Sequence, residues 1–229
     1  MAKLGKSLHK SGKVSTEEKL IEKYYKTTEY YQNNKNRVYT ALTVVILLIV
    51  VAFVYFRNQS SNSEAAALEL SKVKQVYSMD LYQQSISGDS LGTSKGLLFI
   101  VDNYGSTESG QTAKIMLANC YFNLRDFNNA EKYYKDYSGG NELFKTASLA
   151  GTASVYEAKN DFVNAAVYFE KASKISKLVP NNDEYLFYAV RNYYYAKDAD
   201  NLKKAIKALK DEYPKSKYIV QITRFDMGL

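Results

Sequence analysis

The run of nineteen residues from Val38 to Phe56 contains no charged side chain, and it constrains the fold more than any other feature of the sequence. A helix of this length is roughly 28 Å long at about 1.5 Å per residue, close to the ~30 Å hydrocarbon core of a bilayer. Tyr39 and Tyr55 lie near its two ends, where aromatic rings favour the membrane interface. A buried core helix would show a polar stripe, and a cleavable signal peptide would have a short basic start and small residues after its apolar segment. The run shows neither pattern, so we expect residues 37–57 to form a retained transmembrane helix.

The charges that flank this run predict its orientation. Residues 1–37 contain nine Lys and Arg side chains against four Glu, whereas Arg57 is the only basic residue between the run and Lys72. The positive-inside rule therefore predicts a basic cytoplasmic tail over residues 1–36 and an extracytoplasmic domain over residues 58–229. Most of the net charge of +7 belongs to this tail, beside anionic lipid, so we expect no nucleic-acid binding.

The tail itself contains a predicted amphipathic helix. Ser15 and Glu18 have the spacing of a capping box, which predicts a helix from Thr16 to about Asn33. Two interpretations stay open: an interfacial helix on the inner leaflet, or a helix that docks on a cytoplasmic loop of a membrane partner. The apolar residues at helical spacing are Leu20, Ile21, Tyr24, Tyr25, Thr28 and Tyr31.

Composition argues against catalysis and against a β fold. Cys120 is the only cysteine and His9 the only histidine, which excludes an intramolecular disulfide, a multi-thiolate zinc site and a histidine-based triad outside the tail. The nucleotide-binding, hydrolase and zinc-protease motifs are absent. We therefore expect no enzymatic activity, no cofactor or metal, and no small-molecule substrate. Only two prolines and 11 glycines occur in the chain, which disfavours sandwiches and barrels and predicts an all-α fold.

Beyond the apolar run, the sequence reads as a series of helices. We expect a polar hinge over Asn58–Ser63 and a break at Gly88, followed by helices of 10 to 20 residues with short connections, which is the pattern of stacked α-hairpins. A short last helix should follow Pro214. The other predicted helices begin near Glu64, Thr93, Thr107, Phe127, Glu142, Phe162, Asp183 and Asn201.

An internal repeat links these helices. The segments 125–134 and 160–169 are identical at five of ten positions at an offset of 35 residues. Small residues in this pattern allow two helices to approach closely, aromatic residues fill the seam, and an aspartate caps the second helix of each pair. The matched pairs are Ala118 and Ala153, Tyr121 and Tyr156, Asp126 and Asp161, Ala130 and Ala165, and Tyr134 and Phe169. In a third, degenerate unit we expect Arg191 to replace the small residue and the turn around residues 198–200 to be longer.

These residues resemble the tetratricopeptide repeat, in which a small residue is followed by Tyr three positions later, Ala nine beyond it and an aromatic residue four further on. The resemblance is strongest over residues 107–178 and implies an α-hairpin solenoid over residues 58–229. Such arrays bind polypeptides in a concave groove lined by the first helix of each unit.

The whole layout, with a basic tail, one anchor and a short repeat array, resembles the ancillary subunit of the bacterial Sec translocon. That family implies an inner-membrane protein with a periplasmic repeat domain, which acts as a chaperone-like accessory of the channel and contacts channel subunits and exported polypeptides. The alternative is a structural scaffold that recruits envelope partners in division, wall synthesis or outer-membrane export.

The resemblance also implies which residues line the groove. Asparagine can hydrogen-bond the backbone of any guest, and tyrosine offers amphipathic contact area, which suits tolerant capture of extended polypeptide. The alternative is that these side chains form only a solvated face. The implied positions are Asn119, Phe122, Asn123, Ser154, Glu157, Tyr188, Asn192 and Tyr195.

Overall fold

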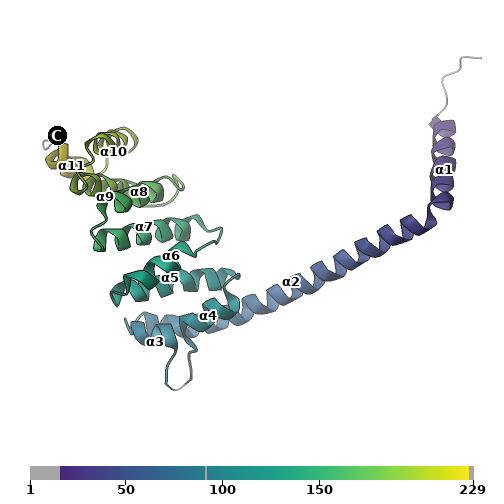
Figure 1. Cartoon of the computed structure of the whole chain (residues 1–229), viewed down its shortest axis with the longest axis horizontal. Helices are drawn as coiled ribbons and strands as arrows, with labels where there is room; N and C mark the ends of the chain where they lie inside the picture. Colours follow the sequence, from purple (N-terminus) through teal and green to yellow (C-terminus); the bar gives the residue numbers. More distant parts are fainter. Residues whose placement is uncertain (1–15, 91, 227–229) are drawn as a thin grey trace, which may run out of the picture. The chain divides into compact units, whose positions relative to one another are not determined.

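The computed structural model describes residues 16–90 and 92–226, and over these residues the protein contains helices and no strand (Figure 1). The chain divides into two compact units, one that ends at Arg57 and one that begins at Asn58. The predicted all-α class is therefore confirmed for the described residues.

The first unit contains α1 (Thr16–Asn33) and the first part of α2 (Lys35–Tyr77). The predicted helix from Thr16 to Asn33 has the expected bounds, although the capping residue Ser15 lies outside the described residues. α2 contains the whole uncharged run, and none of the described side chains in that run is buried. α2 is thus long and apolar enough to span a membrane.

The predicted hinge over Asn58–Ser63 is wrong, because α2 continues through these residues to Tyr77. None of the six residues is Gly or Pro, so each costs only a few tenths of a kcal/mol of helix propensity, and an established helix extends readily. Ser63 adapts to the helix by donating its hydroxyl to the backbone oxygen of Gln59 at 2.8 Å.

The second unit continues with nine more helices among the described residues. They are α3 (Tyr82–Ser87), α4 (Gly96–Tyr104), α5 (Glu108–Asn123), α6 (Phe127–Lys135), α7 (Glu142–Ala158), α8 (Phe162–Ser173), α9 (Asn182–Tyr195), α10 (Ala199–Glu212) and α11 (Tyr218–Asp226). The starts predicted from Thr107 to Asn201 lie within two residues of those observed, and the short last helix follows Pro214 as predicted.

The region between α2 and α4 differs from the prediction. Instead of one helix from Glu64 to Gly88, α2 ends at Tyr77 and α3 is a separate helix. Asp80 adopts a left-handed conformation with φ 58°, a turn that an aspartate tolerates and that has no Gly or Pro to signal it. α4 begins at Gly96, three residues after the predicted Thr93. A Cβ on Gly96 would lie 2.3 Å from the backbone nitrogen of Gly88, so the two ends of the loop cross where only glycine fits.

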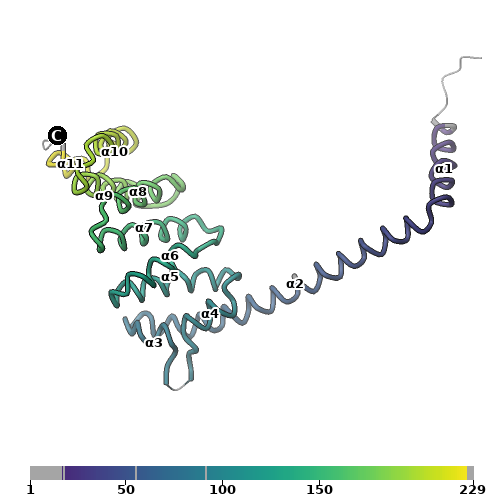
Figure 2. Tube along the Cα trace, viewed as in Figure 1, coloured from purple at the N-terminus to yellow at the C-terminus, as the bar shows by residue number. Residues whose placement is uncertain are grey.

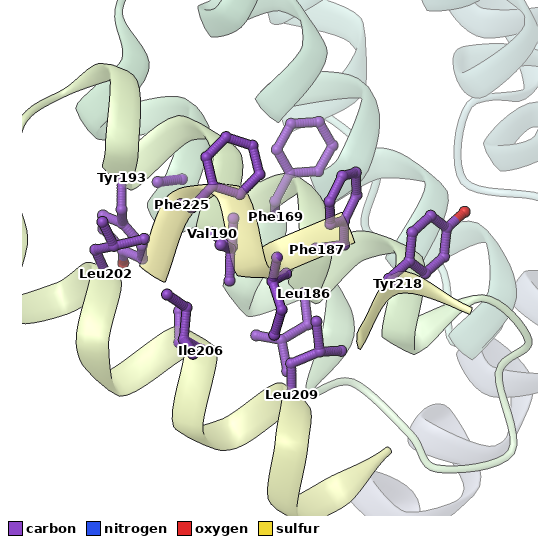
Figure 3. Close-up of a cluster of buried hydrophobic side chains, with 14 of the residues drawn as sticks. Phe169, Leu186, Phe187, Val190, Tyr193, Leu202, Ile206, Leu209, Tyr218 and Phe225 are labelled. Carbon is purple, nitrogen blue, oxygen red and sulfur yellow. The ribbon is translucent and has the colours of Figure 1, made fainter. Parts of the chain in front are cut away.

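Helices that follow one another from α3 to α11 pack against each other, and α5 also contacts α7 as α9 contacts α11. Their apolar faces form two clusters of buried side chains, one centred on α5 and one on α9. Figure 3 shows the second cluster, in which Leu202, Ile206 and Leu209 of α10 face Leu186 and Val190 of α9. The alanines of the repeat, Ala118, Ala130, Ala153 and Ala165, are all completely buried, as their predicted role in helix packing requires.

Three turns of the second unit have the same construction. Arg125, Asn160 and Lys197 each adopt a left-handed conformation with φ between 59° and 62°. The residue that follows each of them is an aspartate that begins the next helix and accepts a hydrogen bond from the backbone N–H three residues later. The three capping residues are Asp126, Asp161 and Asp198.

This shared geometry corrects the predicted third repeat. In each turn the backbone N–H of the capping aspartate donates to the backbone oxygen of a tyrosine five residues earlier. The acceptors are Tyr121, Tyr156 and Tyr193 in the three turns. The small-residue position of the third unit is therefore Val190 and not Arg191. The third turn has the same length as the other two. The missed sequence signal is an aspartate followed three residues later by asparagine, at 126–129, 161–164 and 198–201.

Candidate protein-binding surface

The predicted groove residues lie on α5, α7 and α9, the first helices of three hairpins. The corrected register of α9 shifts the equivalent positions of its hairpin by one residue. Counted from the turn, Arg191 corresponds to Asn119 and Ser154, Tyr194 to Phe122 and Glu157, and Tyr195 to Asn123. Sequence reasoning thus missed Arg191 and Tyr194 on α9.

Asn119 of α5 forms hydrogen bonds with side chains of two other helices, α2 and α6. Its amide nitrogen donates to the hydroxyl of Tyr77 at 3.1 Å, and its amide oxygen accepts from the hydroxyl of Tyr134 at 2.6 Å. Burial of Tyr134 raises the pKa of its phenol, so the group stays a donor at physiological pH. Both ends of the Asn119 amide are therefore occupied by contacts within the chain.

The next two predicted residues of α5 are more accessible. Phe122 is half-buried, and its ring packs on Phe127 with the centroids 5.6 Å apart. Asn123 is exposed and donates to the backbone oxygen of Asn119 at 2.9 Å. These residues offer one ring surface and one polar side chain to a partner.

An ion pair joins α7 to α9. Glu157 accepts from Arg191 Nη2 at 2.5 Å, and the guanidinium lies 4.8 Å from the ring centroid of Tyr188. Tyr188 donates to Glu184 at 2.7 Å, and this hydrogen bond, with burial, raises the pKa of the Tyr188 phenol to about 12. Ser154, one turn earlier on α7, donates to Ala150 within its own helix. Glu157, Arg191 and Tyr188 therefore form a connected polar group between α7 and α9.

Asn192 lies inside the protein. Its side chain is 0% exposed, and its amide nitrogen donates to the backbone oxygen of Tyr188 at 2.9 Å. The predicted groove position at Asn192 results from the one-residue error in the register of α9, and we leave Asn192 out of the candidate surface.

The end of α9 presents two exposed aromatic rings. Tyr194 is 38% exposed and Tyr195 is 50% exposed. Tyr195 packs on Phe162 of α8 with the centroids 5.4 Å apart, and Tyr194 packs on Phe225 of α11 at 5.1 Å. The rings are thus fixed in position while their outer faces stay available. We define the candidate surface as Phe122, Asn123, Ser154, Glu157, Arg191, Tyr194 and Tyr195.

A separate charged network joins α6 to α7. Glu131 accepts hydrogen bonds from Lys135 at 2.6 Å, from Tyr156 at 3.0 Å and from Lys159 at 2.8 Å. Partial burial alone would raise the pKa of Glu131, but the three donors outweigh it and lower that pKa to about 2. The network therefore stabilises the contact between consecutive hairpins.

The remaining reactive group of the region is Cys120, which is completely buried. Burial raises the pKa of its thiol to about 12, so Cys120 packs as a small apolar side chain. No group of three or more His, Cys, Asp and Glu side chains that could hold a metal ion occurs in residues 16–90 and 92–226. In comparisons with known proteins, no family model, no curated protein and no solved structure matches the chain.

Proposed function

We propose that the chain is a membrane-anchored, tetratricopeptide-like module that binds polypeptides. The observation that supports this most strongly is the threefold recurrence of one hairpin turn, with a left-handed residue, a capping aspartate and a bond back to a tyrosine. Repeated hairpins of this kind stack into arrays that expose one helix of each pair to a partner. α2 supplies an apolar helix long enough to anchor the array.

The chemistry of the candidate surface suits binding without a reaction. Tyr194 and Tyr195 contribute large rings that lose little conformational entropy on binding, because packing already holds them. Asn123 can donate to or accept from a guest backbone whatever the guest sequence. The Glu157–Arg191 pair offers one charge of each sign. This mixture favours tolerant binding of an extended segment over recognition of one ligand.

For the cellular role we propose an accessory, chaperone-like subunit of the Sec translocation channel. The tail would be cytoplasmic and the hairpin array periplasmic, and the partners would be channel subunits and exported polypeptides. The support is the order of the regions, because a basic tail, one apolar helix and an array of hairpins follow each other in that family's layout.

Affinity purification of the full chain from membranes in mild detergent, followed by mass spectrometry, tests this role. We expect Sec channel subunits in amounts comparable to the chain. A double variant of the candidate surface, Asn123→Ala with Tyr195→Ala, should retain the channel and lose exported polypeptides. Lys203→Ala with Lys207→Ala, at exposed positions of α10, is the matched control. Recovery of division, wall-synthesis or outer-membrane machinery instead of the channel would overturn the Sec assignment and favour the scaffold.

A further inference from the structure

α1 has an exposed apolar stripe that nothing in the described residues covers. Leu20, Ile21 and Tyr24 are 62%, 56% and 69% exposed. Leu20, Tyr24 and Tyr31 recur at the spacing that aligns side chains along one face of a helix. Lys19, Lys23 and Lys26 recur at the same spacing along the flank beside this stripe, and all three are exposed.

The short connection between α1 and α2 determines where the stripe lies relative to α2. Asn34 is the single residue between the two helices, and the chain turns sharply there (Figure 2). Tyr31 and Tyr39 meet across the turn, with their hydroxyl oxygens 2.8 Å apart and their rings in an edge-to-face contact. In a straight helix the two residues would be about 12 Å apart along the axis, so this contact holds the turn closed.

The depth of Tyr39 determines the depth of α1. Tyr39 is the second residue of the uncharged run and therefore lies at the edge of the hydrocarbon core if α2 spans the membrane. Tyr31 contacts Tyr39 and must lie at the same level. Since the chain turns at Asn34, the rest of α1 extends across the direction of α2 and along the membrane surface.

We propose that α1 lies in the interface of the membrane that α2 crosses, with the stripe of Leu20, Ile21 and Tyr24 against the acyl chains. Lys19 and Lys23 reach the phosphates of the lipid headgroups from the flank of the helix. Lys26 pairs instead with Glu22 at 2.7 Å and stays on the water side. The inference rests on the proposed membrane anchoring. It selects the lipid surface over a protein partner, because the one-residue connection keeps the stripe at this surface whether or not a partner is present.

The absence of tryptophan from the sequence makes a direct test possible, since one introduced tryptophan is a unique reporter. Three variants of the full chain, Tyr24→Trp, Lys26→Trp and Leu48→Trp, are reconstituted in vesicles of phosphatidylcholine and phosphatidylglycerol. The lipids have bromine atoms near the headgroup in one set and near the chain ends in another. Quenching of the emission by bromine reports the depth of each reporter.

We expect Tyr24→Trp to lose most of its emission with the shallow bromines, Lys26→Trp to stay largely unquenched, and Leu48→Trp to be quenched by the deep bromines. Equal quenching at positions 24 and 26 would overturn the proposed orientation. An unquenched Tyr24→Trp beside a quenched Leu48→Trp would overturn the proposal, leave the anchor intact and favour docking of the stripe on a protein partner. An unquenched Leu48→Trp would overturn the membrane anchor itself.

Discussion

Single aspartates determine where the second helix of each hairpin begins. Asp126 accepts the backbone N–H of Asn129 at 3.1 Å and the side-chain amide of the same residue at 2.6 Å. These two hydrogen bonds lower the pKa of Asp126, which keeps the carboxylate ionised at the positive end of the helix. Asp198 makes the same pair of bonds to Asn201. One side chain thus satisfies two donors and specifies the turn.

Replacement of Asp198 by alanine tests the third turn. The loss of a capping side chain costs about 1 kcal/mol, which corresponds to a decrease of roughly 2–4 °C in Tm for a chain of this size. Thermal unfolding of the full chain in detergent, followed by far-ultraviolet circular dichroism, measures this. Asp200→Ala in the first turn of α10 should have a smaller effect. If Asp200→Ala costs more than Asp198→Ala, the proposed equivalence of the three turns is incorrect.

The contribution of Glu131 to the stability of the chain should depend on pH. Its pKa is lowered from 4.5 to about 2 in the folded chain, so its contribution to stability is complete above pH 4.5 and is lost as pH falls toward 2. Glu131→Gln should therefore be less stable than the unsubstituted chain at neutral pH, and the difference should shrink on acidification. Denaturant unfolding at a series of pH values measures this, with Glu64→Gln at an exposed position of α2 as the control. A difference that stays constant with pH would show that the Lys135 and Lys159 contacts do not act on the ionised carboxylate.

At the scale of elements, the hairpins depend on the close approach of consecutive helices. α7 approaches α6 at Gly151, where a Cβ would lie 2.3 Å from two ring atoms of Tyr134. Tyr134 has little room to move, because its hydroxyl bonds to Asn119 and its backbone oxygen accepts from Ser148 at 2.6 Å. The lack of a side chain at Gly151 therefore lets α6 pack closely on α7, although glycine is less favourable than alanine inside a helix.

Gly151→Ala is predicted to destabilise the chain. Helix propensity alone would favour alanine by about 1 kcal/mol. The clash with the Tyr134 ring should lie at the upper end of the about 1–3 kcal/mol that overpacking costs, so we expect a net loss of about 1–2 kcal/mol. Equilibrium unfolding in urea gives the sign. Gly140→Ala is the matched control, since no atom lies within 4 Å of its added Cβ, and it should be close to neutral. A stabilised Gly151→Ala would mean that α6 and α7 are less closely packed than described.

The elements also show what the sequence could and could not predict. Helix starts with a capping residue and an apolar period were predicted well, because those signals are local. The continuation of α2 through Asn58–Ser63 and the turn at Asp80 were not, since neither has a Gly or Pro to mark it. On the candidate surface, Arg191 was predicted at the small-residue position and Asn192 in the groove, which is one residue out of register. The register is determined by the turn at Lys197, and no Gly or Pro marks that turn in the sequence.

At the scale of the whole molecule, the chain combines an amphipathic helix, an apolar helix and repeated hairpins. The last helix, α11, covers one end of the repeats: Tyr218 stacks on Phe187 with the centroids 4.7 Å apart, and Ile222 is completely buried. α11 therefore packs on α9 and α10 and completes the apolar cluster that these helices share. The candidate surface meets α11 at Tyr194, whose ring packs on Phe225 of α11 and remains 38% exposed.

Site-specific photocrosslinking in intact membranes tests the central claim, that the first helices of the hairpins bind polypeptides. A photoreactive phenylalanine derivative replaces Tyr195 in one variant and Lys203, at an exposed position of α10, in the other. We expect newly exported polypeptides to crosslink at position 195 and to be several-fold less abundant at position 203. Equal crosslinking at the two positions, or crosslinks to exported chains at position 203 alone, would contradict the account.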